Sequence, residues 1–202
     1  MPENPERRAK LGDAAVRVIA REGCRGLTHR AVDREAGVPI GTAVNYHRTR
    51  EDLLIAAAGR LIGPDVIDYA HAHAPAEPTA ACVEDMRTLL RAIVDDAVGP
   101  ARGPMYRVTF ELLLEGVRRP RLREVLAELN RAELAAITAA FAAAGHHLEA
   151  EDLSRATAGL YGVIFGLLTG VPTLDEASAR VAVDELADRL WHSMTPIRAT
   201  PQ

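Results

Sequence analysis

The stretch LTHRAVDREAGVPIGTAVNYHRTREDLL, residues 27–54, decides the fold predicted for this chain. Within it, Thr28 is placed to cap a helix over about 28–36, and Gly37 suits the left-handed end of that helix. A second short helix follows and ends near His47. Helices of so few turns are marginal alone and need packing partners on both sides. The pattern therefore predicts a helix-turn-helix, whose second helix can enter the major groove of DNA.

Longer helices are predicted on both sides of this stretch. The NPE sequence at residues 4–6 suits an N-cap followed by proline in the first helical turn, and Gly23 suits the end of that helix. After the stretch, the TRED sequence at residues 49–52 has the spacing of a capping box that opens a longer helix. The two short helices thus have the packing partners that they require.

Composition and helix-breaking residues predict an all-α fold. Apolar residues make up 48% of the chain but aromatic residues only 4%, which favours packed helices over sheets. Proline and glycine separate amphipathic stretches beyond residue 50, and Gly63-Pro64 is expected to bend or break the fourth helix on its way to Tyr69. Five further helices bring the expected number to nine, over about 83–98, 105–115, 120–144, 150–169 and 175–193.

Charge is distributed unevenly along the chain, although the net charge is only -4. Residues 1–50 contain ten Lys or Arg and six Asp or Glu, a net charge of +4, whereas residues 51–202 contain fourteen and twenty-two, a net charge of -8. This division favours a DNA-facing domain at 1–50 and an acidic helical domain at 51–202. Short helices also carry uneven charge by chance, so the assignment depends on the motifs.

The cysteines and the amino terminus indicate the compartment. Cys24 and Cys82 lie far apart and in no metal-type spacing, so neither a disulfide framework nor a zinc finger is expected. The first ten residues lack the apolar stretch of a secretory signal, and no apolar run approaches the roughly 20 residues that cross a bilayer. A soluble protein of the reducing cytoplasm is predicted.

No enzyme motif is recognisable in the chain. It lacks a Gly-rich phosphate loop, a nucleophile elbow and zinc-protease spacing, so no catalytic residue and no cofactor are predicted. His146-His147 lies near Glu149 and Glu151 and has metal-binding side chains, but adjacent histidines among solvated acids are more often a polar turn. No metal site is therefore predicted. The alternative to a DNA-binding protein is a helical ligand-binding or enzymatic protein whose helix-turn-helix is incidental.

Residues 27–54 resemble the DNA-binding domain of the tetracycline-repressor (TetR) family. Three positions depart from the family pattern: Asp33 stands where a small residue is usual, Pro39 where a Ser-type cap is common, and His47 in place of phenylalanine. These departures bear on turn packing and phosphate contact. The features that carry the resemblance are the Thr28 cap, Ala36-Gly37-Val38, Gly41-Thr42, the aromatic Tyr46 and the run from Thr49 to Leu54.

The resemblance implies a homodimeric bacterial regulator, most simply a repressor that leaves a palindromic operator when a small, largely apolar molecule binds its C-terminal domain. It also implies roles for residues in the helix-turn-helix. Structural alternatives remain, since Thr28 can serve only as a cap, Tyr46 can pack against the first helix and Asn45 can be merely solvated. The implied base contacts come from Ile40, Thr42, Ala43 and Asn45, and the implied phosphate contacts from Thr28, Tyr46, His47 and Arg50.

Two further sets of residues follow from the resemblance and from spacing. Gly159, Gly162, Gly166 and Gly170 form one stripe of a helix, where each interior glycine costs about 0.8–1 kcal/mol relative to alanine. Close approach of a partner helix would offset this cost at Gly159, Gly162 and Gly166, and the family dimerises through its last two long helices; a bent helix or a bound ligand is the alternative. A ligand cavity, or else ordinary core, is expected at Met105, Tyr106, Phe110, Phe141, Tyr161 and Phe165.

Overall fold

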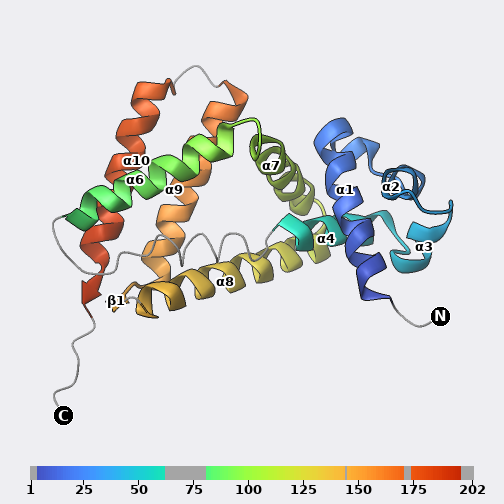
Figure 1. Cartoon of the computed structure of the whole chain (residues 1–202), viewed down its shortest axis with the longest axis horizontal. Helices are drawn as coiled ribbons and strands as arrows, with labels where there is room; N and C mark the ends of the chain where they lie inside the picture. Colours follow the sequence, from blue (N-terminus) through green and yellow to red (C-terminus); the bar gives the residue numbers. More distant parts are fainter. Residues whose placement is uncertain (1–3, 62–80, 144, 171–173, 197–202) are drawn as a thin grey trace, which may run out of the picture. The chain divides into compact units, whose positions relative to one another are not determined.

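The computed structural model describes residues 4–61, 81–143, 145–170 and 174–196. Within these ranges the chain forms nine helices and an antiparallel ribbon of two very short strands (Figure 1). The predicted helical fold and number of helices are confirmed, and the ribbon is an addition. The helices are α1 (Pro5–Gly26), α2 (His29–Ala36), α3 (Thr42–Tyr46), α4 (Arg50–Leu61), α6 (Ala81–Val98), α7 (Gly103–Val117), α8 (Pro120–Ala143), α9 (Ala150–Thr169) and α10 (Glu176–Ser193), and the strands are β1 (His146–His147) and β2 (Thr195–Pro196).

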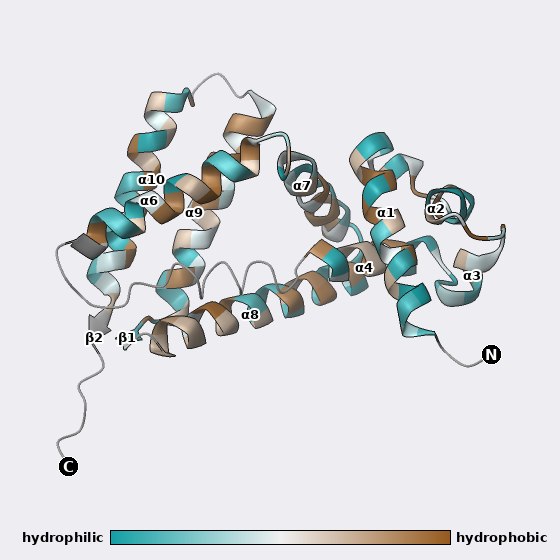
Figure 2. Ribbon diagram, viewed as in Figure 1, coloured by the Kyte–Doolittle hydropathy of each residue, from teal (hydrophilic) through white to brown (hydrophobic). Residues whose placement is uncertain are grey.

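The ends of α1 follow the signals in the sequence. Asn4 caps the helix by accepting a hydrogen bond from the N–H of Arg7 at 3.0 Å, and Pro5 occupies the first turn. This first turn is hydrophilic (Figure 2). Gly23 has a φ of +70° and kinks the helix before its last residues, which a residue without Cβ does at little cost.

The caps of α2 and α4 also agree with the predictions. The Thr28 side chain accepts a hydrogen bond from the N–H of Ala31 at 3.1 Å, and Gly37 ends α2 with a φ of +61°. Thr49 and Asp52 form the reciprocal capping box of α4, with N–H to side-chain oxygen distances of 3.0 and 3.1 Å. The predicted continuation of this helix towards Tyr69 lies outside the described residues.

The chain divides into two compact units. Unit 1 contains residues 1–63 and 104–130, and unit 2 contains residues 64–103 and 131–202. Because α8 covers residues 120–143, its first part belongs to unit 1 and the remainder to unit 2. Unit 1 therefore contains the helix-turn-helix together with α4, most of α7 and the start of α8. The functional division predicted at residue 50 stays a prediction.

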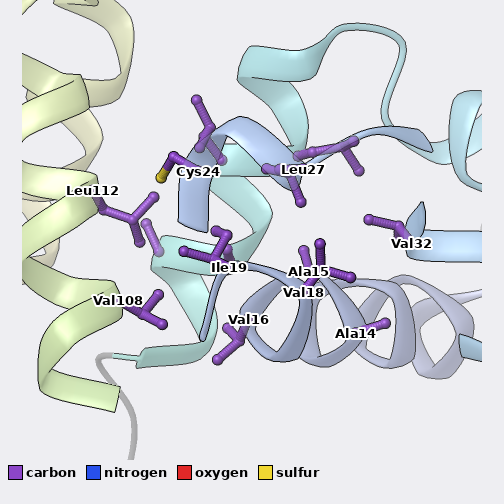
Figure 3. Close-up of a cluster of buried hydrophobic side chains, with 14 of the residues drawn as sticks. Ala14, Ala15, Val16, Val18, Ile19, Cys24, Leu27, Val32, Val108 and Leu112 are labelled. Atoms are coloured by element: carbon purple, nitrogen blue, oxygen red, sulfur yellow. The ribbon is translucent and has the colours of Figure 1, made fainter. Parts of the chain in front are cut away.

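The core of unit 1 surrounds the inner face of α1 (Figure 3). Val18 and Ile19 of α1 lie with Leu27 and with Val108 and Leu112 of α7, and all five side chains are buried. Burying a side chain of this size contributes about 1.5–3 kcal/mol. Within this core α2 is anchored by Ala31, Val32 and Ala36, whereas α3 contributes the single fully buried side chain of Ala43. The position of α3 thus depends on polar contacts as well.

Unit 2 is built on α6, α9 and α10, which pack against one another (Figure 1). Two arginines of α6 form two-pronged ion pairs with aspartates of α10: Arg87 with Asp188, both contacts at 2.8 Å, and Arg91 with Asp184, both at 2.7 Å. Apolar side chains of the same helices are buried between them, including Met86, Leu90 and Val183. None of the described helices is long and apolar enough to cross a membrane.

Candidate nucleic-acid interface

Asp33, on α2, holds the beginning of α3. Its carboxylate accepts hydrogen bonds from the N–H groups of Gly41 and Ala43, each at 2.7 Å, and the residue is only 1% exposed. Gly41 has a φ of +94°, a left-handed backbone conformation that a residue without Cβ adopts at little cost. The free N–H groups and the partial positive charge of a helix beginning offset the buried negative charge. This departure from the family pattern therefore fixes α2 and α3 relative to each other.

The outer face of α3 and the turn before it carry part of the predicted base-contacting set. Ile40 is 62% exposed and Asn45 is also exposed, whereas Thr42 is half-buried and donates its hydroxyl proton to the carbonyl of Pro39 at 2.6 Å. Ala43 is fully buried in the core, so its methyl group does not reach the surface. Val44, for which the sequence predicted no role, is 43% exposed and lies between Ile40 and Asn45 in the sequence.

Two of the residues predicted to contact phosphate have structural roles as well. Thr28 caps α2 while remaining exposed, so its backbone and side chain are accessible from solvent. Tyr46 is half-buried and packs against the core of unit 1. Both positions are compatible with a contact made by the outer part of the residue.

Arg50 faces inward, towards the link between α1 and α2. Its guanidinium donates hydrogen bonds to the carbonyls of Cys24 and Leu27, the latter at 3.3 Å. It also lies close enough to Glu115 to help lower the pKa of that carboxyl group, after the larger effect of Arg119. These partners occupy the side chain, so its predicted phosphate contact stays a prediction. The exposed Arg48 forms no ion pair with any residue that the structure describes.

His47 is also inside the unit, although the sequence predicted a phosphate contact for it. The residue is 4% exposed, and its Nε2 has no hydrogen-bond partner among the described residues. Burial lowers the pKa of the imidazole, and the positive charge of Arg8 lowers it further. His29 Nε2 lies 2.6 Å from the carbonyl oxygen of His47, and since a carbonyl only accepts, this nitrogen carries the proton.

Ion pairs connect α1 to α2 within the helix-turn-helix region. Arg17 and Arg21 of α1 both contact the carboxylate of Glu35 on α2, at 2.7 and 2.8 Å. The two arginines lower the pKa of Glu35, so its charge persists into acid. The exposed arginines of α2, Arg30 and Arg34, are not drawn into these pairs and keep unit 1 basic on the side of α2.

The predicted ligand residues fall in both units. Met105, Tyr106 and Phe110 belong to unit 1, where Met105 packs against the core. The others belong to unit 2, where Phe141 is 3% exposed and Phe165 is 41% exposed. None of the six lines the cavity beside the end of α3, the one around Glu111 or the one around Arg91. The ligand-binding assignment therefore stays a prediction.

The glycine stripe of α9 packs largely within its own chain. A Cβ at Gly159 would lie 2.7 Å from a methyl group of Leu186 on α10, and one at Gly166 would lie 2.8 Å from a methyl group of Leu174. At Gly162 nothing lies within 4 Å, and the residue is exposed. Neighbours in the same chain thus offset the cost of two glycines, and Gly162 is the member of the predicted interface that faces open space.

The histidine pair at 146–147 does not form a metal-type cluster. His146 is 1% exposed, with its ring centroid 6.1 Å from that of Trp191, while His147 contacts Glu149 at 2.9 Å in a polar turn. No group of three or more His, Cys, Asp or Glu side chains suited to a metal occurs in the described ranges.

Comparison with known proteins finds relatives both for the C-terminal part of the chain and for most of its length. Residues 81–191 match the family model of the tetracyclin repressor-like C-terminal domain. The structure of the multidrug binding protein EbrR complexed with ethidium is similar, with a TM-score of 0.70 and 30% identity, covering 91% of this chain and 99% of that one. A TetR family member from Streptomyces coelicolor A3 is 31% identical, with a TM-score of 0.66, covering 90% of this chain and 98% of that one.

A shorter match concerns a curated transcription factor. The HTH-type transcriptional regulator BetI of Rhizobium meliloti (strain 1021) is 42% identical over 59 residues. This match spans 29% of the present chain and 29% of BetI, so it relates only a segment of the two proteins.

Proposed function

This chain belongs to the TetR family of transcriptional regulators, and from that premise we propose that it is a homodimeric repressor that a small ligand releases from a palindromic operator. Regulators of this family are not enzymes, which agrees with the prediction from sequence. The observation that supports DNA binding best is the outer face of α3. Val44 and Asn45 are exposed there, Ile40 is exposed in the turn just before the helix, and Asp33 holds the beginning of α3.

The chemistry of this face fits readout of base edges. Asn45 has an amide that can bond both N6 and N7 of adenine, and the apolar side chains of Ile40 and Val44 suit the methyl group of thymine. Thr42 lies one turn from Tyr46 on the same helix and is half-buried. We assign base contacts to these positions in place of the buried Ala43, and phosphate contacts to Thr28 and Tyr46.

The proposed ligand is a small aromatic cation. EbrR was solved with ethidium, proflavin and malachite green, which are largely apolar and positively charged. Residues 51–202 of the present chain carry a net charge of -8, which favours a cation. Glu133 of α8, in unit 2, is half-buried and forms no ion pair with a described residue, and burial raises its pKa. A cation beside this carboxylate would relieve that burial cost.

The test begins with selection of duplexes from a random library by the full chain, followed by fluorescence anisotropy on the selected sequence. We expect a two-fold symmetric site and an affinity that falls steeply between 50 and 200 mM salt. Malachite green should then release the duplex, and an unrelated repressor on its own operator controls for direct effects of the dye on DNA. Absence of salt-sensitive duplex binding would favour the alternative of an incidental helix-turn-helix.

A further inference from the structure

His47 directly follows α3 and ties the end of this helix to α2. Its N–H donates a hydrogen bond to the carbonyl of Ala43 at 2.8 Å, which closes the last turn of α3. Its own carbonyl accepts a hydrogen bond from Nε2 of His29 on α2 at 2.6 Å. Asn45 and Tyr46, to which DNA contacts are assigned, immediately precede it. A change at His47 therefore reaches the DNA-contacting end of α3 directly.

The imidazole of His47 is buried without the partner that a charged ring requires. The residue is 4% exposed, and its Nε2 is the single buried side-chain nitrogen or oxygen in the described ranges that lacks a hydrogen-bond partner. When the ring takes up a proton, both of its nitrogens become donors, and Nε2 then belongs to a buried cation without an acceptor. Because burying an unpaired charge costs far more than burying an unpaired neutral group, the buried position favours the uncharged ring.

The charged groups that surround the ring do not compensate a proton on it. Burial lowers the pKa of His47 most, and the positive charge of Arg8 on α1 and the ring of His29 on α2 lower it further. Asp52 on α4 has the opposite effect, but both of its oxygens are engaged, one by Arg121 of α8 at 2.6 Å and the other in the capping box of α4. Among the described residues, no carboxylate beside the ring is left to pair with it.

A cavity of about 680 Å³ beside the ring gives it a route to water. The cavity lies within unit 1 and is lined by His47 together with residues of the first turns of α1, of α4 and of the first turn of α8. The remaining charged side chains of the lining are Arg48 and Arg60, both positive. A charged ring that turns into the cavity gains hydration, but it leaves its buried place next to α3.

We propose that His47 is a positioning residue for operator recognition, which holds the end of α3 in place only while its ring is uncharged. Proton uptake moves the ring towards the cavity, releases the end of α3 and weakens operator binding as the pH falls below neutral. The effect on DNA rests on the proposed function, whereas the proton-dependent position of α3 does not. His47 stands where the family pattern has phenylalanine, which takes up no proton, so this dependence belongs to the present chain.

The two neighbouring histidines can be separated by substitution. Nε2 of His29 carries a proton in the neutral ring, because the carbonyl of His47 only accepts, and it keeps that proton in the charged ring. Titration of His29 therefore leaves its hydrogen bond in place. His29→Gln keeps an N–H donor and takes up no proton, whereas His47→Phe keeps an aromatic ring in the buried position and removes the titrating group. His47→Gln is a second uncharged variant, of smaller volume.

The first experiment uses the full chain without DNA. NMR follows the imidazole of His47 and the backbone amides of α3 from pH 7.5 downwards, while circular dichroism confirms that the protein stays folded. We expect the amides of Asn45 and Tyr46 to change with the same midpoint as this imidazole, below the ordinary value of 6.5. In His47→Phe and His47→Gln the same amides should keep their signals of pH 7.5. Amides of α3 that do not follow the titration of His47 would contradict the proposal.

The second experiment measures affinity for the selected duplex at pH 7.5 and 5.5, at constant ionic strength. We expect the natural protein to lose about tenfold in affinity, equivalent to about 1.4 kcal/mol, the order of the cost of one unpaired buried polar group. His47→Phe should lose at most about twofold over the same interval. His29→Gln should lose as much as the natural protein, because the buried ring of His47 still titrates.

The outcomes separate the proposal from its alternatives. An equal loss of affinity in the natural protein and in both His47 variants would assign the pH dependence to other groups and overturn the proposal. Tighter binding in acid that disappears in His47→Phe would also overturn it, since the charged ring would then contact the DNA backbone. If no duplex is bound at any pH while the amides of α3 still follow His47, the repressor function fails and the proton-dependent position of α3 stands.

Discussion

Asp33 Oδ1 accepts a hydrogen bond from the N–H of Ala43 at 2.7 Å, across the turn between α2 and α3. The other oxygen of the same carboxylate accepts from Gly41 at the same distance. Since α3 is short and buries only one side chain in the core, these two bonds carry much of its positioning.

Asp33→Asn is therefore expected to lower stability by about 1–3 kcal/mol, because the side-chain amide can accept only one of the two bonds and leaves a buried N–H unpaired. Urea unfolding followed by circular dichroism measures this loss, and hydrogen exchange at Ala43 should speed up more than exchange in α1. Asp13→Asn, at a half-exposed site, controls for the lost charge. Equal exchange rates at Ala43 in both proteins would show that the core alone holds α3.

Asn45→Ala should change base preference at one position of each half-site. The loss expected is about 1–3 kcal/mol on the preferred base and little on the others, since a two-pronged contact to one base is removed. Repeating the duplex selection with the variant measures the preference directly. Uniform weakening on all sequences would instead indicate a contact to the DNA backbone.

Arg50→Ala is expected to reduce stability by about 1–2 kcal/mol, because two backbone carbonyls lose their hydrogen-bond donor. Since the guanidinium faces these carbonyls, we expect the salt dependence of duplex binding to stay unchanged, in contrast to the phosphate contact predicted from the sequence. Urea midpoints and the slope of log K against log salt test the two statements separately. A slope reduced by about one per protomer would restore the phosphate contact.

Acid should destabilise the protein through His47. Burial lowers the pKa of this imidazole below its ordinary value of 6.5, so the unfolded chain takes up the proton first. The contribution of the uncharged His47 to stability is therefore fully present above pH 6.5, and it is lost as the pH falls through that value towards the lowered pKa. Urea midpoints at pH 7.5 and 5.5 should differ less in His47→Phe than in the natural protein. His147→Gln, which changes an exposed histidine, should leave the difference intact, and an equal loss in His47→Phe would assign it to other groups.

Gly162→Leu should fold and yet weaken dimerisation if the exposed stripe of α9 meets a partner. Gly166→Leu is expected to destabilise unit 2 regardless of dimerisation, because the new side chain would collide with Leu174. Sedimentation velocity measures the oligomeric state, and circular dichroism measures folding. A folded Gly162→Leu variant with the sedimentation coefficient of the natural dimer would place the interface elsewhere.

The sequence predicted best what local chemistry determines. Thr28, Gly37 and the capping box at Thr49 and Asp52 mark helix ends through bonds that span three or four residues, so their roles follow from spacing. The family resemblance predicted the fold, and the structural relatives confirm it.

What escaped prediction depends on contacts between distant segments. Arg50 bonds carbonyls more than twenty residues away, and the inward position of Ala43 follows from how α3 docks on the core. The glycines of α9 show the same limit, because the neighbours of Gly159 and Gly166 come from Leu186 and Leu174. Spacing identified a close approach correctly and did not identify which chain supplies it.

The paired ion bridges between α6 and α10 fix the position of one helix along the other. Arg87 and Arg91 are one turn apart, as are Asp184 and Asp188, so the two bridges form rungs of equal spacing. Sliding of one helix along the other by a full turn, about 5.4 Å, would re-form only one of the two rungs, by pairing Arg87 with Asp184 or Arg91 with Asp188. The two bridges therefore oppose sliding of α6 along α10 and favour movement of the two helices together.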